Sequence, residues 1–153
     1  MRPRRQNEQV PDGPPLLSQL NLPVGDMEAS LGFYRGLGLS VDAEPGAEHV
    51  AIRFPGGMLL ELDSAGFVRQ WDSGYAGSRG GSAVIGFAVA SREAVDTTYQ
   101  ALLGAGGRPR QRPYDAFWGA RYAIVDDPDG NPVGLMSPID RSRASWPPAA
   151  PPG

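Results

Sequence analysis

Cysteine and lysine are missing from this chain of 153 residues, and histidine occurs once. The lack of cysteine excludes disulfide bridges, thiolate nucleophiles and cysteine metal sites. The lack of lysine excludes Schiff-base chemistry and the lysine of a phosphate-binding P-loop. A Ser–His–Asp triad would have to use the single histidine, His49, and nothing in the sequence around it indicates one.

Long hydrophobic runs and an excess of positive charge are also missing. No segment approaches the roughly 20 apolar residues that a membrane-spanning helix needs. The first 15 residues lack the apolar segment of a secretory signal. The formal net charge of -3 gives no basic face for binding phosphates. We therefore expect a cytoplasmic protein that binds neither membranes nor nucleic acid.

Glycine and proline are abundant, with 21 and 16 residues, and many of them lie near the two ends. Neither end contains enough apolar surface to offset the entropy lost on ordering. We therefore expect residues 1–15 to form a flexible N-terminal arm. We expect residues 141–153 to form a proline-rich C-terminal tail.

A first strand-and-helix pattern occupies residues 16–63. Apolar and polar residues alternate up to Val24, which indicates a strand. Apolar residues then recur at helical spacing after Asp26, a favourable N-cap. Three short segments with strand character follow, at residues 39–43, 49–54 and 58–63, and the last two are joined by a Gly-Gly turn. The predicted order is β-α-β-β-β.

The same order returns in residues 82–140. A strand leads to a helix capped by Ser91, and a segment at residues 108–113 is expected at a sheet edge because its prolines cannot donate to a ladder. A DPDG turn separates the last two strands. Residues 64–81 form the linker between the modules, and its three aromatic side chains suggest that it packs against the body.

The two patterns align residue by residue, with Leu20 matching Ile85 and Leu60 matching Val133. An internal repeat of this size indicates two similar modules related by a pseudo-twofold axis. The predicted fold class is α+β, with two βαβββ modules in tandem whose curved mixed sheets enclose a cavity. The face of each sheet opposite its helix should line that cavity. In the first module this face carries the polar residues Gln19, Asn21, Glu61 and Asp63, and in the second it carries the small or apolar residues Val84, Gly86, Ala88, Pro132, Gly134 and Met136.

Three segments resemble the vicinal oxygen chelate superfamily, which includes glyoxalase I, extradiol dioxygenases, fosfomycin resistance proteins and bleomycin-binding proteins. The segments are FYRGLGL after the first strand, then LLELD, then DDPDGNPVGLMSP. The resemblance covers roughly residues 16–139, and the duplicated βαβββ order supports it. It implies two βαβββ modules and usually a homodimer. The richness in glycine and proline, together with arginine in place of all lysine, suggests a bacterial origin.

In metal-using members, the resemblance implies four ligand positions, which are Gln19, Glu61, Val84 and Gly134 in this chain. Val84 and Gly134 offer no ligating side chain, and metal users typically have glutamate at the latter position. A catalytic metal generally needs three or more protein ligands, so we expect no metal cofactor. If a divalent metal does bind, we expect Gln19, Glu61 and His49 to hold it.

Glu61 has two interpretations from sequence alone. It can pair with Gln19 and recognise a donor group on a ligand, or act as a general base in an apolar pocket. Alternatively it is a structural strand residue, paired with an arginine such as Arg53 or Arg121.

An aromatic cluster occurs in the segment PYDAFWGARY. Its four rings are Tyr114, Phe117, Trp118 and Tyr122, and Asp115 and Arg121 lie among them as possible orienting charges. Flat ligands stack on such rings. The same rings can instead seal the core or a dimer interface.

Three functions remain open at this point. The first is metal-independent binding of a small aromatic or amphipathic molecule, of the sequestration or antibiotic-resistance type, with Gln19, Asn21 and Glu61 as polar anchors. The second is a divalent-metal-dependent enzyme of the glyoxalase (lyase or isomerase) or dioxygenase type, with Glu61 at the catalytic centre. The third is a structural or regulatory dimer without a ligand.

Overall fold

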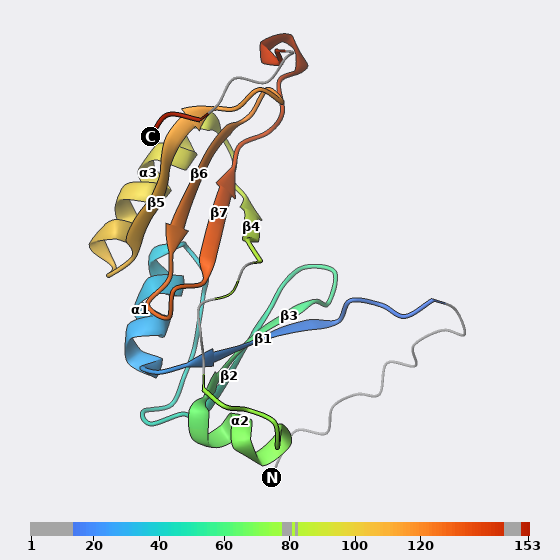
Figure 1. Cartoon of the computed structure of the whole chain (residues 1–153), viewed down its shortest axis with the longest axis vertical. Coiled ribbons are helices and arrows are strands. Elements are labelled where there is room, and N and C mark those ends of the chain that lie inside the picture. Colours follow the sequence, from blue (N-terminus) through green and yellow to red (C-terminus); the bar gives the residue numbers. More distant parts are fainter. Residues whose placement is uncertain (1–13, 78–80, 82, 146–150) are drawn as a thin grey trace.

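The computed structural model describes residues 14–77, 81, 83–145 and 151–153. They form two modules, each with a mixed sheet and a helix against one face of it (Figure 1). The predicted N-terminal arm, residues 1–15, lies outside the described residues except at its last two positions.

The first module begins with a strand and a helix that is capped by a side chain. Its elements are β1 (Gln19–Val24), α1 (Met27–Gly36), β2 (His49–Arg53) and β3 (Leu59–Ser64). The sheet order is β1-β3-β2, with β1 parallel and β2 antiparallel to β3. As predicted, Asp26 caps α1, because its side chain accepts a hydrogen bond of 3.0 Å from the Ala29 amide.

The strand predicted at residues 39–43 is wrong, since this segment pairs with no strand. Its alternation is nevertheless real, because Val41 is buried while Ser40 and Asp42 are exposed. The Arg35 guanidinium donates to the Val41 carbonyl at 3.2 and 3.0 Å. A side chain therefore satisfies a backbone group that a ladder would otherwise use.

The second module has the complete predicted order. Its elements are β4 (Ile85–Ala88), α3 (Arg92–Gly104), β5 (Arg108–Asp115), β6 (Arg121–Asp126) and β7 (Pro132–Met136). The sheet order is β4-β7-β6-β5, which confirms that the proline-containing strand β5 lies at an edge. A single turn of 3-10 helix, Arg141–Arg143, follows.

The linker between the modules contains a short helix, α2 (Ala65–Trp71), which the sequence analysis does not predict. Ser64, the last residue of β3, caps it by accepting a hydrogen bond of 3.1 Å from the Phe67 amide. The helix packs against β3 and β1, and Val68 is buried there. The expectation that the linker packs is therefore confirmed.

The sheet registers confirm the internal repeat. In the first module Leu20 pairs with Leu60, and in the second Ile85 pairs with Val133, as their alignment in sequence requires. Both pairs are parallel and join the first strand of a module to its last. The fold class is thus α+β with two tandem modules, and the two sheets remain separate rather than closing into a barrel.

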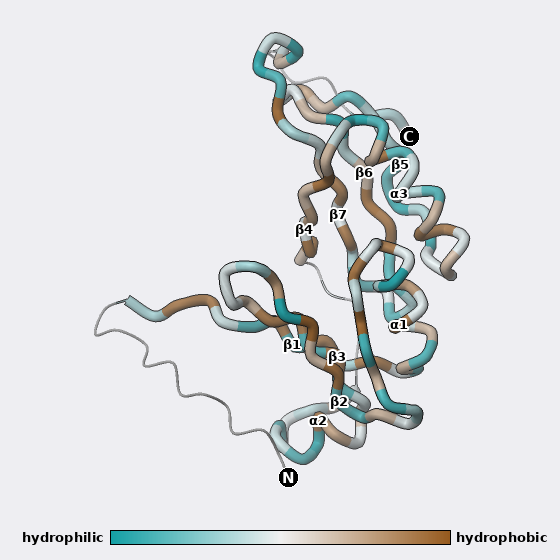
Figure 2. Tube along the Cα trace, turned by 180° about the vertical axis from the view of Figure 1, so that it is seen from behind, coloured by the Kyte–Doolittle hydropathy of each residue, from teal (hydrophilic) through white to brown (hydrophobic). Residues whose placement is uncertain are grey.

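The hydrophobic core lies between the two modules, where α1 packs against α3 (Figure 1). Phe33 and Tyr34 of α1 are fully buried with Leu102 of α3. In Figure 2 the most hydrophobic residues are concentrated on the strands, β6 and β7 among them. Along the helices, hydrophobic and hydrophilic residues alternate. Full burial of each such apolar side chain contributes about 1.5–3 kcal/mol.

The DPDG turn forms a polar joint between the modules. The fully buried Asp127 accepts a hydrogen bond of 2.8 Å from the Tyr34 hydroxyl and one of 2.8 Å from the Asn131 amide. The Asp129 side chain extends to the start of α1, where it accepts a hydrogen bond of 2.9 Å from the backbone amide of Gly25. Burial, followed by the neighbouring Asp127 carboxylate, raises the pKa of Tyr34 far above its ordinary value, so its hydroxyl stays a donor.

Candidate functional site

A polar cluster lies on the face of the first sheet opposite α1. The β1–β3 register sets Asn21 beside Glu61, and the Asn21 amide donates to Glu61 Oε2 at 2.7 Å and to Asp63 Oδ2 at 3.0 Å. The two acids are only 3% and 0% exposed, respectively. One amide group therefore bridges two buried carboxylates.

His49 completes the polar cluster from the neighbouring strand β2. Its Nδ1 atom lies 2.5 Å from Asp63 Oδ1, so both oxygens of this carboxylate are engaged. The imidazole ring lies beside Phe67 of α2, with ring centroids 5.0 Å apart. Side chains alternate along β2, so His49 lies on the same face of the sheet as Glu61. This alternation is the feature of the sequence that indicates a place for His49 in the polar cluster.

The predicted pair of Gln19 with Glu61 is wrong. In the register, Gln19 lies opposite Leu59, and its exposed side chain donates to Asn21 Oδ1 at 3.3 Å. The alternative pairing of Glu61 with Arg121 is also wrong, because Arg121 binds acidic residues of the second module. Asn21 is the partner of Glu61.

The predicted aromatic cluster forms on the second sheet. The β5–β6 register sets Tyr114 beside Tyr122, with ring centroids 6.4 Å apart in an edge-to-face arrangement. Trp118 contacts both tyrosines edge-on at 6.5 and 5.4 Å, and Phe117 lies 5.1 Å from Trp118. All four rings are partly exposed, so they do not form a closed core.

The two tyrosines of this cluster remain protonated in the physiological range. Burial raises the pKa of the Tyr114 hydroxyl above its ordinary value. Burial likewise raises the pKa of Tyr122, and the neighbouring Tyr114 adds to the effect. Their hydroxyl groups are therefore neutral and able to donate a hydrogen bond.

The two charges predicted to orient a ligand are bound to other protein groups. Arg121 Nε and Nη2 each lie 2.8 Å from an oxygen of Asp96 on α3, and its Nη1 lies 3.1 Å from Asp115. Burial alone would raise the pKa of Asp115, but hydrogen bonds and charges from Arg121 and Arg92 hold it below its usual range. This network fastens α3 to the second sheet.

Among the described residues, the hollow between the modules differs from the predicted cavity: Gly86 and Ala88 of the predicted small-residue face line it, but the predicted polar face does not. The hollow between the modules has a volume of about 420 Å³ and lies at the apolar residues of both sheets. Its lining residues are Leu20, Leu39, Phe54, Met58, Leu59, Leu60, Ile85, Gly86, Phe87 and Ala88. Neither Asn21 nor Glu61 nor any ring of the aromatic cluster reaches it.

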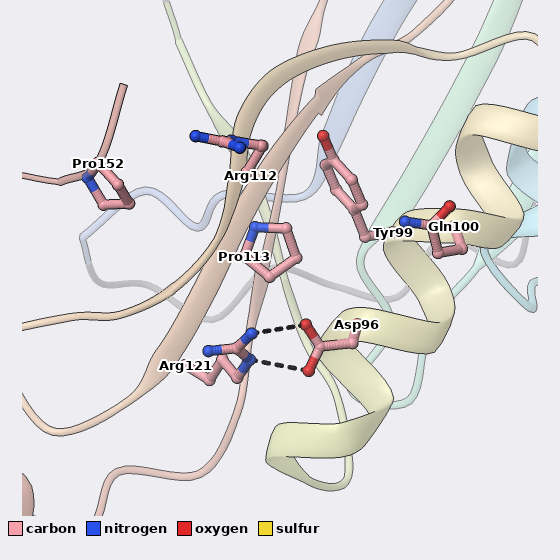
Figure 3. A pocket seen from close by; sticks show the side chains of 7 residues that line it. All are labelled: Asp96, Tyr99, Gln100, Arg112, Pro113, Arg121 and Pro152. Atoms are coloured by element: carbon pink, nitrogen blue, oxygen red, sulfur yellow. Dashed lines mark hydrogen bonds and ion pairs between the residues drawn. The ribbon is translucent and has the colours of Figure 1, made fainter.

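A second hollow, of about 440 Å³, lies between α3 and β5 (Figure 3). Arg121 and Asp96 face each other across its lower part, and Tyr99 and Arg112 lie above them. Arg121 and Tyr122 are consecutive strand residues and point to opposite faces of the sheet. This hollow therefore lies on the far side of the second sheet from Tyr122.

The residues present do not fit a catalytic metal at the four positions that the family resemblance implies. Gly134 has no side chain, Val84 is apolar, Gln19 is exposed, and Glu61 Oε2 is already bound to Asn21. In the part of the chain that the structure describes, no group of three or more His, Cys, Asp or Glu is arranged to hold a metal ion. A typical site needs three or more protein ligands.

The family model of the Glyoxalase/Bleomycin resistance protein/Dioxygenase superfamily matches residues 16–135. The chain belongs to this superfamily. No curated protein matches the chain.

Solved structures of the superfamily share the fold. A glyoxalase-related enzyme from Fulvimarina pelagi is 24% identical with a TM-score of 0.71, over 90% of this chain and 99% of that chain. A family enzyme from Burkholderia phytofirmans PsJN is 20% identical with a TM-score of 0.68, over 79% and 97%. A lactoylglutathione lyase from Agrobacterium tumefaciens is 18% identical with a TM-score of 0.59, over 81% and 94%. At these identities the likeness shows the fold alone.

Among the described residues, no helix has the length and apolar character of a membrane-spanning helix.

Proposed function

We propose that this superfamily member binds a small aromatic or amphipathic molecule without a metal ion, as a sequestering or resistance protein does. The observation that carries the proposal is the unequal pair of open faces. One face presents the largely buried polar cluster, and the other presents the partly exposed aromatic rings, of which Tyr122 lies over Gly134. Such a combination of a few polar anchors and an apolar surface is typical of small-molecule sites.

The polar cluster supplies the anchors in this proposal. Glu61 and Asp63 are held by Asn21 and His49 rather than by an arginine. A ligand donor that approaches Glu61 Oε1 gains a charge-assisted hydrogen bond, which is about twice as strong as a neutral one. Gln19 lies at the exposed rim of the cluster.

The aromatic cluster supplies the stacking surface. Trp118 lies at its centre, in edge-to-face contact with Tyr114, Phe117 and Tyr122. An aromatic pair adds about 0.5–1.5 kcal/mol beyond the area that it buries. Trp118 is therefore the natural reporter of ligand binding.

We further propose that the two faces come together in a homodimer. Within one chain the hollow between the modules reaches neither cluster, and Val84, beside the aromatic cluster, is 45% exposed. A twofold dimer places the same patch of each subunit against its partner, so one subunit's polar cluster can face the other's rings.

Fluorescence titration tests the binding proposal. Purified protein is titrated with a panel of aromatic natural products, in the presence of a chelator, while tryptophan emission is followed. We expect at least one compound to quench emission, and expect Trp118→Phe to lose most of that response. Trp71→Phe is the matched control, since Trp71 lies exposed on α2 and its loss should leave the ligand response intact.

The same titration can contradict the proposal. No response across the panel, or a response that survives in Trp118→Phe, would remove it. Binding that appears only after addition of manganese, iron, nickel or zinc would favour the metal-dependent enzyme instead.

A further inference from the structure

Tyr122 lies across the face of Gly134, one of the four positions that would carry a metal ligand. A Cβ atom added to Gly134 would lie 2.8 Å from the Tyr122 hydroxyl oxygen and 3.0 Å from Val84 Cγ1. It would also lie 3.4 Å from Tyr122 Cε2. Real Cβ atoms do not approach other atoms to 2.8 Å, so the tyrosine occupies the space that a side chain at position 134 would need.

The backbone does not require glycine at this position. Gly134 is not among the glycines with positive φ, so other residues can adopt its conformation. Glycine inside a strand weakens it and often marks a site of close approach. The absence of a side chain at Gly134 is therefore explained by the ring of Tyr122 above it.

The neighbouring strand leaves open space beside that ring. Gly86 of β4 is the register partner of Gly134 in β7, and adjacent strands lie about 4.8 Å apart. A Cβ atom at Gly86 would meet no atom within 4 Å. The sheet surface next to the Tyr122 hydroxyl is consequently flat and unfilled.

The hydroxyl that borders this surface is a free donor in the described part of the chain. No hydrogen bond joins Tyr122 Oη to any described residue, and none joins Tyr114 Oη. Burial raises the pKa of Tyr122, so its proton is retained at neutral pH. The flat floor and the free donor point to the same kind of ligand.

We propose that Tyr122 orients the ligand: a planar ring lies on the floor at Gly86, and the Tyr122 hydroxyl donates a hydrogen bond to an acceptor atom at the edge of that ring. This inference rests on the proposed function and narrows the ligand class to planar aromatic molecules that carry such an acceptor. Gly134 is then a specificity-determining position, because any side chain there would displace the donor.

Two fragments of equal shape test the hydrogen bond. Quinoline carries a ring-nitrogen acceptor and naphthalene does not, and their binding is measured by saturation-transfer NMR. For the unmodified chain we expect quinoline to bind about fivefold more tightly, the effect of one neutral hydrogen bond. Tyr122→Phe should abolish the preference. Tyr75→Phe removes the same hydroxyl from the linker and should preserve it.

Two glycine variants test the geometry, the first of them without any ligand. In Gly134→Ala the Tyr122 ring must move, so the near-ultraviolet circular dichroism and the alkaline titration of the tyrosines should change. Gly86→Ala should leave both signals unchanged but weaken both fragments, since the new methyl group fills the floor. Unchanged tyrosine signals in Gly134→Ala would overturn the geometric part of the inference.

Different experimental outcomes would overturn this inference and the proposed function. Equal affinity for the two fragments, a preference that survives in Tyr122→Phe, or no binding of either fragment while panel compounds still quench Trp118 would overturn the role of Tyr122 alone. No binding by any fragment or panel compound would overturn both.

Discussion

The same two positions of the duplicated fold carry opposite chemistry in the two modules. In the first sheet they are Asn21 and Glu61, joined by a hydrogen bond of 2.7 Å. In the second they are Gly86 and Gly134, paired in the same parallel register. The fold therefore fixes the positions of the two paired residues in each sheet. The side chains at these positions decide whether that face of the sheet is charged or lacks side chains.

A third equivalent position sharpens this contrast. His49 pairs with Asp63 across β2 and β3, and Tyr122 pairs with Met136 across β6 and β7. Each ring extends over its own sheet, but the imidazole binds a carboxylate while the phenol covers a glycine. The two equivalent modules thus present one polar wall and one aromatic wall.

Removing Asp127, the centre of the polar joint between the modules, should lower the stability of the fold more than any other change proposed here. Asp127→Ala removes the acceptor of the Tyr34 hydroxyl and of two backbone amides in a fully buried place. We expect a loss of at least about 3 kcal/mol in the free energy of unfolding, measured in urea. Asp140→Ala, at an exposed position, should have a much smaller effect on stability. A loss below about 1 kcal/mol for Asp127→Ala would contradict the role of the joint.

Removing the Asn21 amide, which bridges the two acids of the polar cluster, should lower stability by a smaller amount. Asn21→Leu leaves Glu61 and Asp63 buried without the donor that bridges them, which should cost about 1–3 kcal/mol. The matched variant Gln19→Leu changes an exposed side chain of the same strand and should cost about 0.5 kcal/mol at most. Equal costs in the two variants would show that the bridge contributes nothing.

The smallest expected effect is a pH dependence at the joint. The pKa of Tyr34 is raised in the folded chain, so above about pH 10 the unfolded chain loses a proton that the folded chain keeps. Stability should therefore fall as the pH rises through this range. Tyr34→Phe should cost about 1 kcal/mol at neutral pH and should make the alkaline fall shallower.

Urea midpoints between about pH 8 and about pH 11 measure this fall. Some alkaline loss should persist in Tyr34→Phe, because the pKa values of Tyr114 and Tyr122 are also raised. An identical pH profile in the variant and the unmodified chain would exclude Tyr34 as its main source.

Much of the fold follows from the sequence because apolar alternation reports burial. Alternation aligned Leu20 with Ile85 and Leu60 with Val133, and the sheet registers confirm both matches. Alternation does not report hydrogen bonding, so residues 39–43 were predicted as a strand although only their burial pattern is strand-like. The seven-residue helix α2 is too short to give a helical period.

The sequence predicts which face of the sheet each candidate site residue lies on, but it does not predict which residues are in contact. Alternation places Gln19, Asn21 and Glu61 on one face, whereas the stagger of β1 against β3 decides that Asn21 is the partner. The covering of Gly134 by Tyr122 is a contact between neighbouring strands. Both depend on the relative positions of strands, which a local pattern does not contain.

A metal inventory of the native protein tests the central claim most directly. Protein purified without a chelator is analysed for manganese, iron, cobalt, nickel and zinc by elemental mass spectrometry. Because Gly134 and Val84 offer no ligand and Asn21 already engages Glu61, we predict far less than one ion per chain and no shift in thermal unfolding on addition of these metals. One tightly held ion per chain that is lost in Glu61→Gln would contradict the claim.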